Sequence, residues 1–171
     1  TETLYALGIG GLLVGVTDYC DYPPEARLKP RVGSVLNPNL ERIVALRPDL
    51  VLGSTEVNRL ETADRLERLG IPLFGVTAHT LDQALASIED LGRVLGQEAE
   101  ARGLVARLRT RVAAVEERIA GRRPAQVLFV VWHRPLTTAG RQTFISDVIR
   151  RAGGRSIADD LTGEWPRLSL E

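Results

Sequence analysis

Sulfur and histidine are scarce in this sequence of 171 residues. It contains no methionine, a single cysteine (Cys20) and two histidines (His79 and His133). A single cysteine cannot form a disulfide within the chain, and it excludes a zinc site built from several cysteines. Two histidines are also too few for the metal centres of most zinc enzymes. We therefore expect no metal site.

Neither sign of charge is in excess, and long apolar runs are missing. The 22 lysines and arginines balance the 22 aspartates and glutamates, whereas nucleic-acid-binding domains usually carry a basic surplus. The longest weakly polar run, residues 4–16, contains four glycines and is shorter than the roughly 20 residues that a membrane-spanning helix needs. We expect neither a nucleic-acid partner nor an integral membrane protein.

Signatures of catalysis are missing as well. The sequence has no glycine-rich phosphate loop, no Gly-x-Ser-x-Gly elbow and no His-Glu-x-x-His motif, which mark common classes of enzyme. One enzymatic alternative is a thiol enzyme in which Cys20 pairs with His133, and such a pair needs a third group to orient it. Because nothing in the sequence brings these two residues together, we expect no catalytic residues and no enzymatic activity.

Short apolar runs alternate with amphipathic stretches along the chain, which is typical of an α/β fold. Strands are expected where the apolar runs are brief, and the continuous run 125–132 predicts a strand that is buried on both faces. Thr80 and Gln83 form a capping box at the start of one helix. The pattern predicts helices over 2–7, 37–46, 56–69, 80–95, 97–120 and 143–152, strands over 13–16, 49–52, 71–76, 125–132 and 156–158, and a short strand or loop edge at 32–33.

The stretch 97–120 is the longest helical pattern in the chain. At 1.5 Å per residue it makes a rod of roughly 36 Å, about twice the usual helix length. A surface helix beside a core is one interpretation, and a rod that joins two lobes is the other. We expect an N-terminal α/β lobe over 1–96, a bridging helix over 97–121 and a C-terminal α/β lobe over 122–171.

Both ends of the chain fall inside an expected lobe. The sequence opens within a helix that no strand precedes, and the C-terminal lobe holds one clear strand and one helix. A sheet of one or two strands cannot bury its own faces. We therefore expect material to be missing at both ends.

The most specific segment is Thr-Asp-Tyr-Cys-Asp-Tyr-Pro-Pro, residues 17–24. It follows an expected strand, and open α/β sheets bind ligands at the carboxyl ends of strands. Tyrosine has a flat apolar face with a polar rim, which suits a large planar ligand, and the proline pair stiffens the loop and lowers the entropy lost on binding. From the residues alone, a ligand loop and a solvated turn with inward-packed tyrosine edges are equally favoured.

Two further features are pairs. Asn39-Leu40-Glu41 and Ser169-Leu170-Glu171 share a capping residue, a leucine and a glutamate, with the glutamate placed where the helix dipole favours a carboxylate. The residues alone favour two ordinary helix caps. Trp132, followed by His133, and Trp165 both suit the rim of a cleft, although Trp132 fits a core equally well.

Two stretches resemble a known family. Tyr-Cys-Asp-Tyr-Pro-Pro-Glu-Ala at 19–26 and Asn-Leu-Glu-Arg-Ile-Val-Ala-Leu-Arg-Pro-Asp-Leu-Val-Leu at 39–52 are similar to the periplasmic cobalamin-binding proteins of bacterial ABC importers. More broadly, the chain resembles the helical-backbone (class III) substrate-binding proteins that carry cobalamin, haem and iron-siderophores. The resemblance covers nearly the whole chain. It implies two α/β lobes joined by one rigid helix, with the ligand in a cleft between the lobes.

The resemblance also implies roles for individual residues. Tyr19 and Trp165 are expected to stack on a corrin ring from opposite lobes, and Glu41 and Glu171 to dock onto arginines of the membrane permease. Val35 and Ser54 stand where a cobalamin binder can carry further aromatic side chains, so the expected pocket has less aromatic surface. The residues expected to contact the ligand are Asp18, Tyr19, Cys20, Asp21, Tyr22, Ser54, Trp132, His133 and Trp165.

The implied protein has no cofactor of its own and carries a corrinoid as its transported ligand. Its partner is the transmembrane permease dimer of an ABC importer. We expect a monomer that is periplasmic or is held by a lipid anchor outside the cytoplasmic membrane. Within the same superfamily, a haem or ferric-siderophore carrier is the alternative, because the phenols of Tyr19 and Tyr22 and the thiol of Cys20 suit iron.

Overall fold

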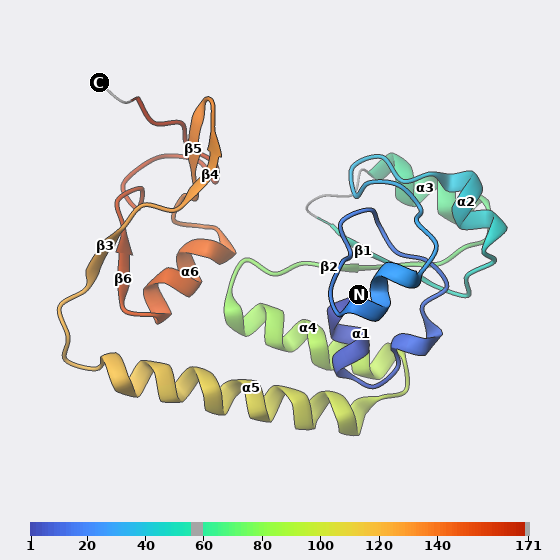
Figure 1. Ribbon diagram of the computed structural model, residues 1–171, viewed down its shortest axis with the longest axis horizontal. Coiled ribbons are helices and arrows are strands. Elements are labelled where there is room, and N and C mark those ends of the chain that lie inside the picture. Colours follow the sequence, from blue (N-terminus) through green and yellow to red (C-terminus); the bar gives the residue numbers. More distant parts are fainter. Residues whose placement is uncertain (56–59, 170–171) are drawn as a thin grey trace. The chain divides into compact units, whose positions relative to one another are not determined.

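The computed structural model describes residues 1–55 and 60–169 (Figure 1). The chain divides into two compact units. Unit 1 comprises residues 1–77 and 91–101, and unit 2 comprises residues 78–90 and 102–171. Both units combine helices with strands, so the expected α/β composition is confirmed. The division into lobes at 96/97 and 121/122 stays a prediction.

Unit 1 is built around one parallel pair of strands. Strands β1 (Val51–Ser54) and β2 (Leu73–Val76) pair in parallel, with Leu52 opposite Phe74. Its buried apolar side chains include Leu4, Val16, Ile43 and Leu66. The other elements assigned wholly to this unit are α1 (Glu2–Ala6), the 3-10 helices η1 (Gly10–Leu12) and η2 (Pro24–Leu28), α2 (Leu40–Ala45) and α3 (Leu60–Arg68). The first residues of the helix expected over 56–69 lie outside the described residues.

The strand expected over residues 13–16 does not form. Gly10–Leu12 makes a 3-10 turn instead, and only Val16 forms a bridge, parallel to Arg31. The prediction was wrong because glycine favours tight turns and because the neighbouring segment offers a single bridging residue. Gly33 bridges Pro38, so residues 32–33 are the edge of a loop rather than a strand.

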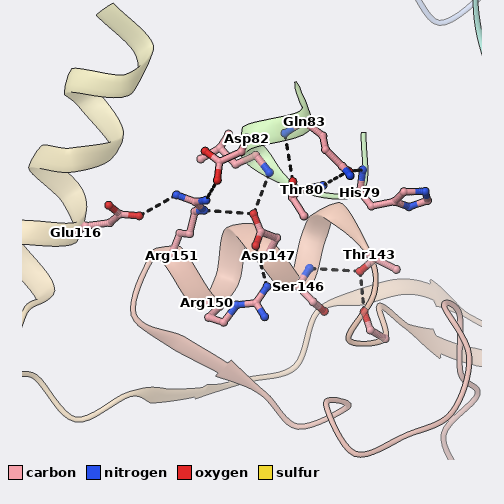
Figure 2. A network of polar contacts seen from close by, with 12 residues as sticks. His79, Thr80, Asp82, Gln83, Glu116, Thr143, Ser146, Asp147, Arg150 and Arg151 are labelled. Carbon is pink, nitrogen blue, oxygen red and sulfur yellow. Dashed lines mark hydrogen bonds and ion pairs between the residues drawn. The ribbon is translucent and has the colours of Figure 1, made fainter. Parts of the chain in front are cut away.

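Two long helices link the units along the chain. Helix α4 (Leu81–Val94) begins in unit 2 and ends in unit 1, and α5 (Glu98–Ile119) begins in unit 1 and ends in unit 2. The expected capping box is confirmed, because the Thr80 hydroxyl accepts from the Gln83 N–H and the Gln83 Oε1 accepts from the Thr80 N–H, both at 3.2 Å (Figure 2). The long helix is confirmed over 22 residues.

Unit 2 contains two separate strand pairs among its described residues. Strand β3 (Ala125–Val127) pairs in parallel with β6 (Gly154–Ser156), and β4 (Val130–His133) pairs antiparallel with β5 (Leu136–Thr138). The continuous buried strand expected over 125–132 is therefore wrong. The chain changes partner between β3 and β4, and the residues from Leu128 to Trp132 are exposed. The last strand lies at 154–156 rather than 156–158, because Gly154 pairs with Ala125.

Helix α6 (Phe144–Arg151) is joined to α4 and α5 by a polar network that we call the α6 clasp (Figure 2). The buried Asp147 Oδ2 accepts the Leu81 N–H at 2.9 Å. Arg151 donates to Asp82 and, at 3.1 Å, to Glu116. The α6 clasp thus ties the first turn of α4 and the second half of α5 to α6, all within unit 2.

Burial of Asp147 alone would raise the pKa of its carboxyl. The Leu81 N–H and the guanidinium groups of Arg150 and Arg151 outweigh this effect and hold that pKa below its ordinary value. The Arg150 Nη2 lies 2.8 Å from Asp147 Oδ1. The clasp therefore contains an ionised, buried carboxylate whose charge is matched by hydrogen bonds and ion pairs.

Candidate functional site

The segment 17–22, which we call the Tyr19 loop, presents its aromatic side chains outward. It follows Val16, whose parallel bridge to Arg31 fixes where the loop leaves the unit 1 core. The side chains of Tyr19 and Tyr22 are 81% and 63% exposed. The tyrosine edges do not pack inward as the interpretation of a solvated turn expected, and contact of this segment with a ligand stays a prediction.

Two arginine side chains donate hydrogen bonds to the backbone of the Tyr19 loop. The Arg31 Nη1 donates to the carbonyl oxygens of Thr17 at 2.7 Å and of Cys20 at 2.9 Å. The Arg27 Nε donates to the carbonyl oxygen of Asp21 at 3.0 Å. Sequence reasoning missed both arginines. Their hydrogen-bond partners are backbone carbonyls, which every residue has, so no partner side chain in the sequence points to these bonds.

The thiol of Cys20 is engaged within unit 1. The Thr1 hydroxyl donates to its Sγ at 3.0 Å, and the Thr17 hydroxyl lies 3.1 Å away. Burial alone would raise the pKa of the Cys20 thiol, but hydrogen bonds from Thr1 and Thr17 contribute to holding it below its ordinary value. The thiol therefore contributes to the structure of the loop, and its expected contact with ligand stays a prediction.

The carboxylates of the Tyr19 loop are free. Asp18 and Asp21 are exposed, and in the part of the chain that the structure describes neither carboxylate forms a hydrogen bond or an ion pair. The Asp18 backbone is nevertheless fixed, because its N–H donates to the Gly33 carbonyl at 3.0 Å. Both carboxylates can therefore accept hydrogen bonds from the amide groups of a ligand.

Two other expected site residues lie in unit 1. Ser54 is the last residue of β1, at the carboxyl end of a parallel strand, where α/β sheets bind ligands. Glu41 is exposed in the first turn of α2, whose cap Asn39 accepts the Arg42 N–H through its side chain at 2.9 Å. Glu171 lies outside the described residues, so only Glu41 of the expected pair is described, and the docking role of both glutamates stays a prediction.

The expected aromatic residues of unit 2 lie on β4. The Trp132 Nε1 donates to the Arg134 carbonyl at 3.0 Å, and its ring centroid lies 5.6 Å from that of His133. The Trp132 side chain is 60% exposed. Trp132 is therefore a surface residue rather than a core residue. Its hydrogen bond to the Arg134 carbonyl restrains the orientation of the indole ring.

Trp165 lies on a segment that runs beside β5. The Thr138 N–H donates to the Pro166 carbonyl at 3.1 Å and the Gly140 N–H to the Glu164 carbonyl at 2.8 Å. Since β4 pairs with the other edge of β5, Trp132 and Trp165 come from segments on either side of one strand. Sequence reasoning missed β5, because Leu-Thr-Thr is too short to show a period.

The expected ligand residues thus form two groups. The Tyr19 loop and Ser54 belong to unit 1, whereas Trp132, His133 and Trp165 belong to unit 2. Among residues 1–55 and 60–169, no group of three or more His, Cys, Asp or Glu side chains could hold a metal ion. No helix in that same described part is both long and apolar enough to cross a membrane.

The chain matches a known protein family over its whole length. A model of periplasmic binding proteins matches residues 1–171. The chain belongs to the periplasmic binding protein family. The resemblance inferred from the sequence is confirmed, and because members of this family bind rather than transform their substrates, the alternative of a thiol enzyme is set aside.

Individual relatives share sequence and fold with this chain. The vitamin B12-binding protein of Yersinia pestis (strain Pestoides F) is 33% identical over 171 residues, which are 100% of this chain and 61% of that protein. The periplasmic vitamin B12-binding protein BtuF of Vibrio cholerae superimposes with a TM-score of 0.88 at 28% identity, over 99% of this chain and 67% of the other. The periplasmic haem-binding protein RhuT of Roseiflexus sp. RS-1 superimposes with a TM-score of 0.86 at 31% identity, over 99% and 66%. The chain thus spans about three fifths of the length of the curated relatives that it matches.

Proposed function

We propose that this protein is an extracytoplasmic substrate-binding protein that captures cobalamin or a related corrinoid and delivers it to an ABC importer. The observation that carries the proposal is the Tyr19 loop, which holds an 81% exposed tyrosine ring on a backbone fixed by arginines. The similarity to vitamin B12-binding proteins supports the same ligand class.

The chemistry of the Tyr19 loop suits a corrinoid. A corrin ring is large, planar and fringed with amides. The exposed face of Tyr19 can stack on such a ring, and the free carboxylates of Asp18 and Asp21 can accept hydrogen bonds from its amide groups. Because the loop backbone is already fixed, little conformational entropy is lost when the ligand binds.

Titration of the purified protein with cobalamin tests the proposal, followed by tryptophan quenching and calorimetry. We expect saturable binding with a Kd at or below the micromolar range. In Tyr19→Ala, the lost stacking should raise the Kd about tenfold, which corresponds to ~1.4 kcal/mol. Leu28→Ala is the matched control, because Leu28 is 85% exposed but lies outside the Tyr19 loop. Absence of binding at about 10 µM cobalamin would contradict the proposal.

A haem carrier is the second candidate. Its support is the similarity to the haem-binding protein of Roseiflexus, together with the two exposed phenols of Tyr19 and Tyr22, which are potential iron ligands. Competition separates the two candidates. If haem displaces bound cobalamin at equal concentration and produces a tyrosinate-type absorption spectrum that is lost in Tyr19→Phe and Tyr22→Phe, the ligand is haem.

Delivery requires a surface that the permease can recognise. We infer that Glu41 belongs to this surface, because it is exposed in the first turn of α2 and no described residue neutralises its charge. Glu171 is proposed as the second docking carboxylate on the strength of its matching sequence pattern. In this proposal the protein works outside the cytoplasmic membrane, either free or held by a lipid anchor, as a monomer that meets a permease dimer.

A further inference from the structure

The Tyr19 loop has little of its own to hold it in place. Residues 17–22 contain no helix or strand, and the side chains of Asp18, Tyr19, Asp21 and Tyr22 are exposed. The hydrogen bonds within the loop run from the Cys20 N–H to the Thr17 carbonyl and from the Asp21 N–H to the Tyr19 carbonyl, each at 3.1 Å, and a third joins the Thr17 hydroxyl to the Cys20 Sγ, also at 3.1 Å. An exposed loop with so few internal bonds samples many conformations unless another group restrains it.

Arg31 supplies such a restraint. Its Nη1 donates to the carbonyls of Thr17 and Cys20, the two ends of the turn that contains Tyr19, at 2.7 and 2.9 Å. Both bonds are short and involve a charged donor, and such hydrogen bonds are about twice as strong as neutral ones. One nitrogen atom of Arg31 therefore restrains both ends of the turn that contains Tyr19.

Arg31 is itself well fixed. The Val16 N–H donates to the Pro30 carbonyl at 2.9 Å, and the Val32 N–H donates to the Val16 carbonyl at 3.0 Å, so Arg31 is held between two backbone bonds to a buried residue. The Arg31 carbonyl also accepts from the Arg42 Nη1 at 3.3 Å. A half-buried guanidinium on a fixed backbone can transmit its position to the loop that it binds.

We propose that Arg31 is a positioning residue that holds the Tyr19 loop in the conformation that receives a large planar ligand, an inference that rests on the proposed function. Arg31 does not touch the ligand in this role. It acts by keeping the binding-competent loop populated before the ligand arrives, so that the apparent affinity is not reduced by the fraction of molecules whose loop is misplaced. Cobalamin is the probe, and haem is the second probe if cobalamin does not bind.

Two substitutions separate this role from mere stability. Both hydrogen bonds to the loop are donated by one nitrogen atom, the Arg31 Nη1. A lysine ammonium has three donors on its single nitrogen, so Arg31→Lys should retain the ligand Kd within about threefold. Arg31→Met keeps the apolar stem and loses the donors, so we expect its Kd to rise about tenfold. In the free protein, amide hydrogen exchange at Cys20 and Asp21 should speed up about tenfold in Arg31→Met, with exchange in α5 unchanged. Lys29→Met is the matched control, because the Lys29 Nζ donates to Gly11 instead of the loop.

Three other outcomes would contradict either the positioning role of Arg31 or the proposed function. Unchanged affinity and unchanged loop exchange in Arg31→Met would show that Arg31 does not position the loop. Faster exchange throughout unit 1, accompanied by the same loss in Arg31→Lys, would reduce Arg31 to a general structural residue. If the unsubstituted protein binds neither cobalamin nor haem, the proposed function fails, and exchange at Cys20 and Asp21 still decides whether Arg31 holds the loop.

Discussion

Gly140 lies where two backbone segments of unit 2 meet. A Cβ at this position would collide with the carbonyl oxygen of Gly163 and lie 3.3 Å from that of Glu164. The second of these oxygens is already hydrogen-bonded, because the Gly140 N–H donates to the Glu164 carbonyl at 2.8 Å. The absence of a side chain at Gly140 therefore allows the segment that carries Trp165 to pack beside β5.

Alanine at Gly140 should displace the Trp165 segment. We expect Gly140→Ala to lower the free energy of unfolding by about 1–3 kcal/mol, the usual cost of forcing atoms into a packed region, and to change the tryptophan emission spectrum. Urea unfolding followed by fluorescence measures both effects. Gly103→Ala is the control, because Gly103 lies inside α5 with room for a Cβ and should be neutral or stabilising by about 0.5–1 kcal/mol. Equal stability of both variants would contradict the steric argument.

At the scale of elements, the α6 clasp anchors the start of α4 to α6. The first N–H groups of a helix have no partner within the helix, and in α4 the one of Leu81 is satisfied by a carboxylate from another helix, Asp147. Arg151 extends the same attachment to Asp82 and Glu116. Charge at the helix start and burial of the carboxylate act together, since an anion is favoured near the positive end of the helix dipole.

Removal of the charge of Asp147 should loosen this attachment. We expect Asp147→Asn to lower the free energy of unfolding by about 1–3 kcal/mol, because a buried hydrogen-bonded charge pair is broken while Arg150 remains beside it. Urea unfolding at pH 7 measures the change. Asp160→Asn is the control, because Asp160 is 88% exposed and lies 3.6 Å from its partner Arg155, and exposed ion pairs contribute only about 0–1 kcal/mol.

The Asp147 carboxylate should also make the free energy of unfolding depend on pH. Because the folded protein holds the pKa of Asp147 below its ordinary value, which is ~3.9 in unfolded chains, the unfolded state binds the proton first as the pH falls. The stabilisation is complete above the ordinary pKa and is lost as the pH falls through the lower folded value. The stability difference between the unsubstituted protein and Asp147→Asn, measured from pH 6 down to pH 2.5, should therefore shrink; a constant difference would contradict this assignment.

Sequence reasoning succeeded at this scale where the bonding partners are close in the chain. The capping box of Thr80 and Gln83 spans three residues and was predicted from them. The strand over 125–132 failed because the choice of partner is made by β5 and β6, which lie further along the chain. The Arg31 bonds to the Tyr19 loop span 14 and 11 residues and involve backbone oxygens, which every residue has, so no pattern of side chains could reveal them.

At the scale of the whole molecule, the proposed delivery of ligand to an importer requires recognition by a second protein. Glu41→Ala should slow uptake of the ligand by cells while the Kd for the ligand stays unchanged, because Glu41 belongs to the proposed docking surface and not to the Tyr19 loop. A radiolabelled cobalamin uptake assay, run beside a binding titration, measures both quantities. Glu98→Ala is the matched control, since Glu98 is an exposed carboxylate in the first turn of α5. If both variants transport at the unsubstituted rate, the docking role is wrong.

The order of the units along the chain has a consequence for recombination. The chain enters unit 1, passes to unit 2 at residue 78, returns to unit 1 at residue 91 and leaves it again at residue 102. A single genetic crossover between two relatives therefore cannot exchange one whole unit for another. A chimera that inherits an intact unit needs three junctions, two of them inside α4 and α5.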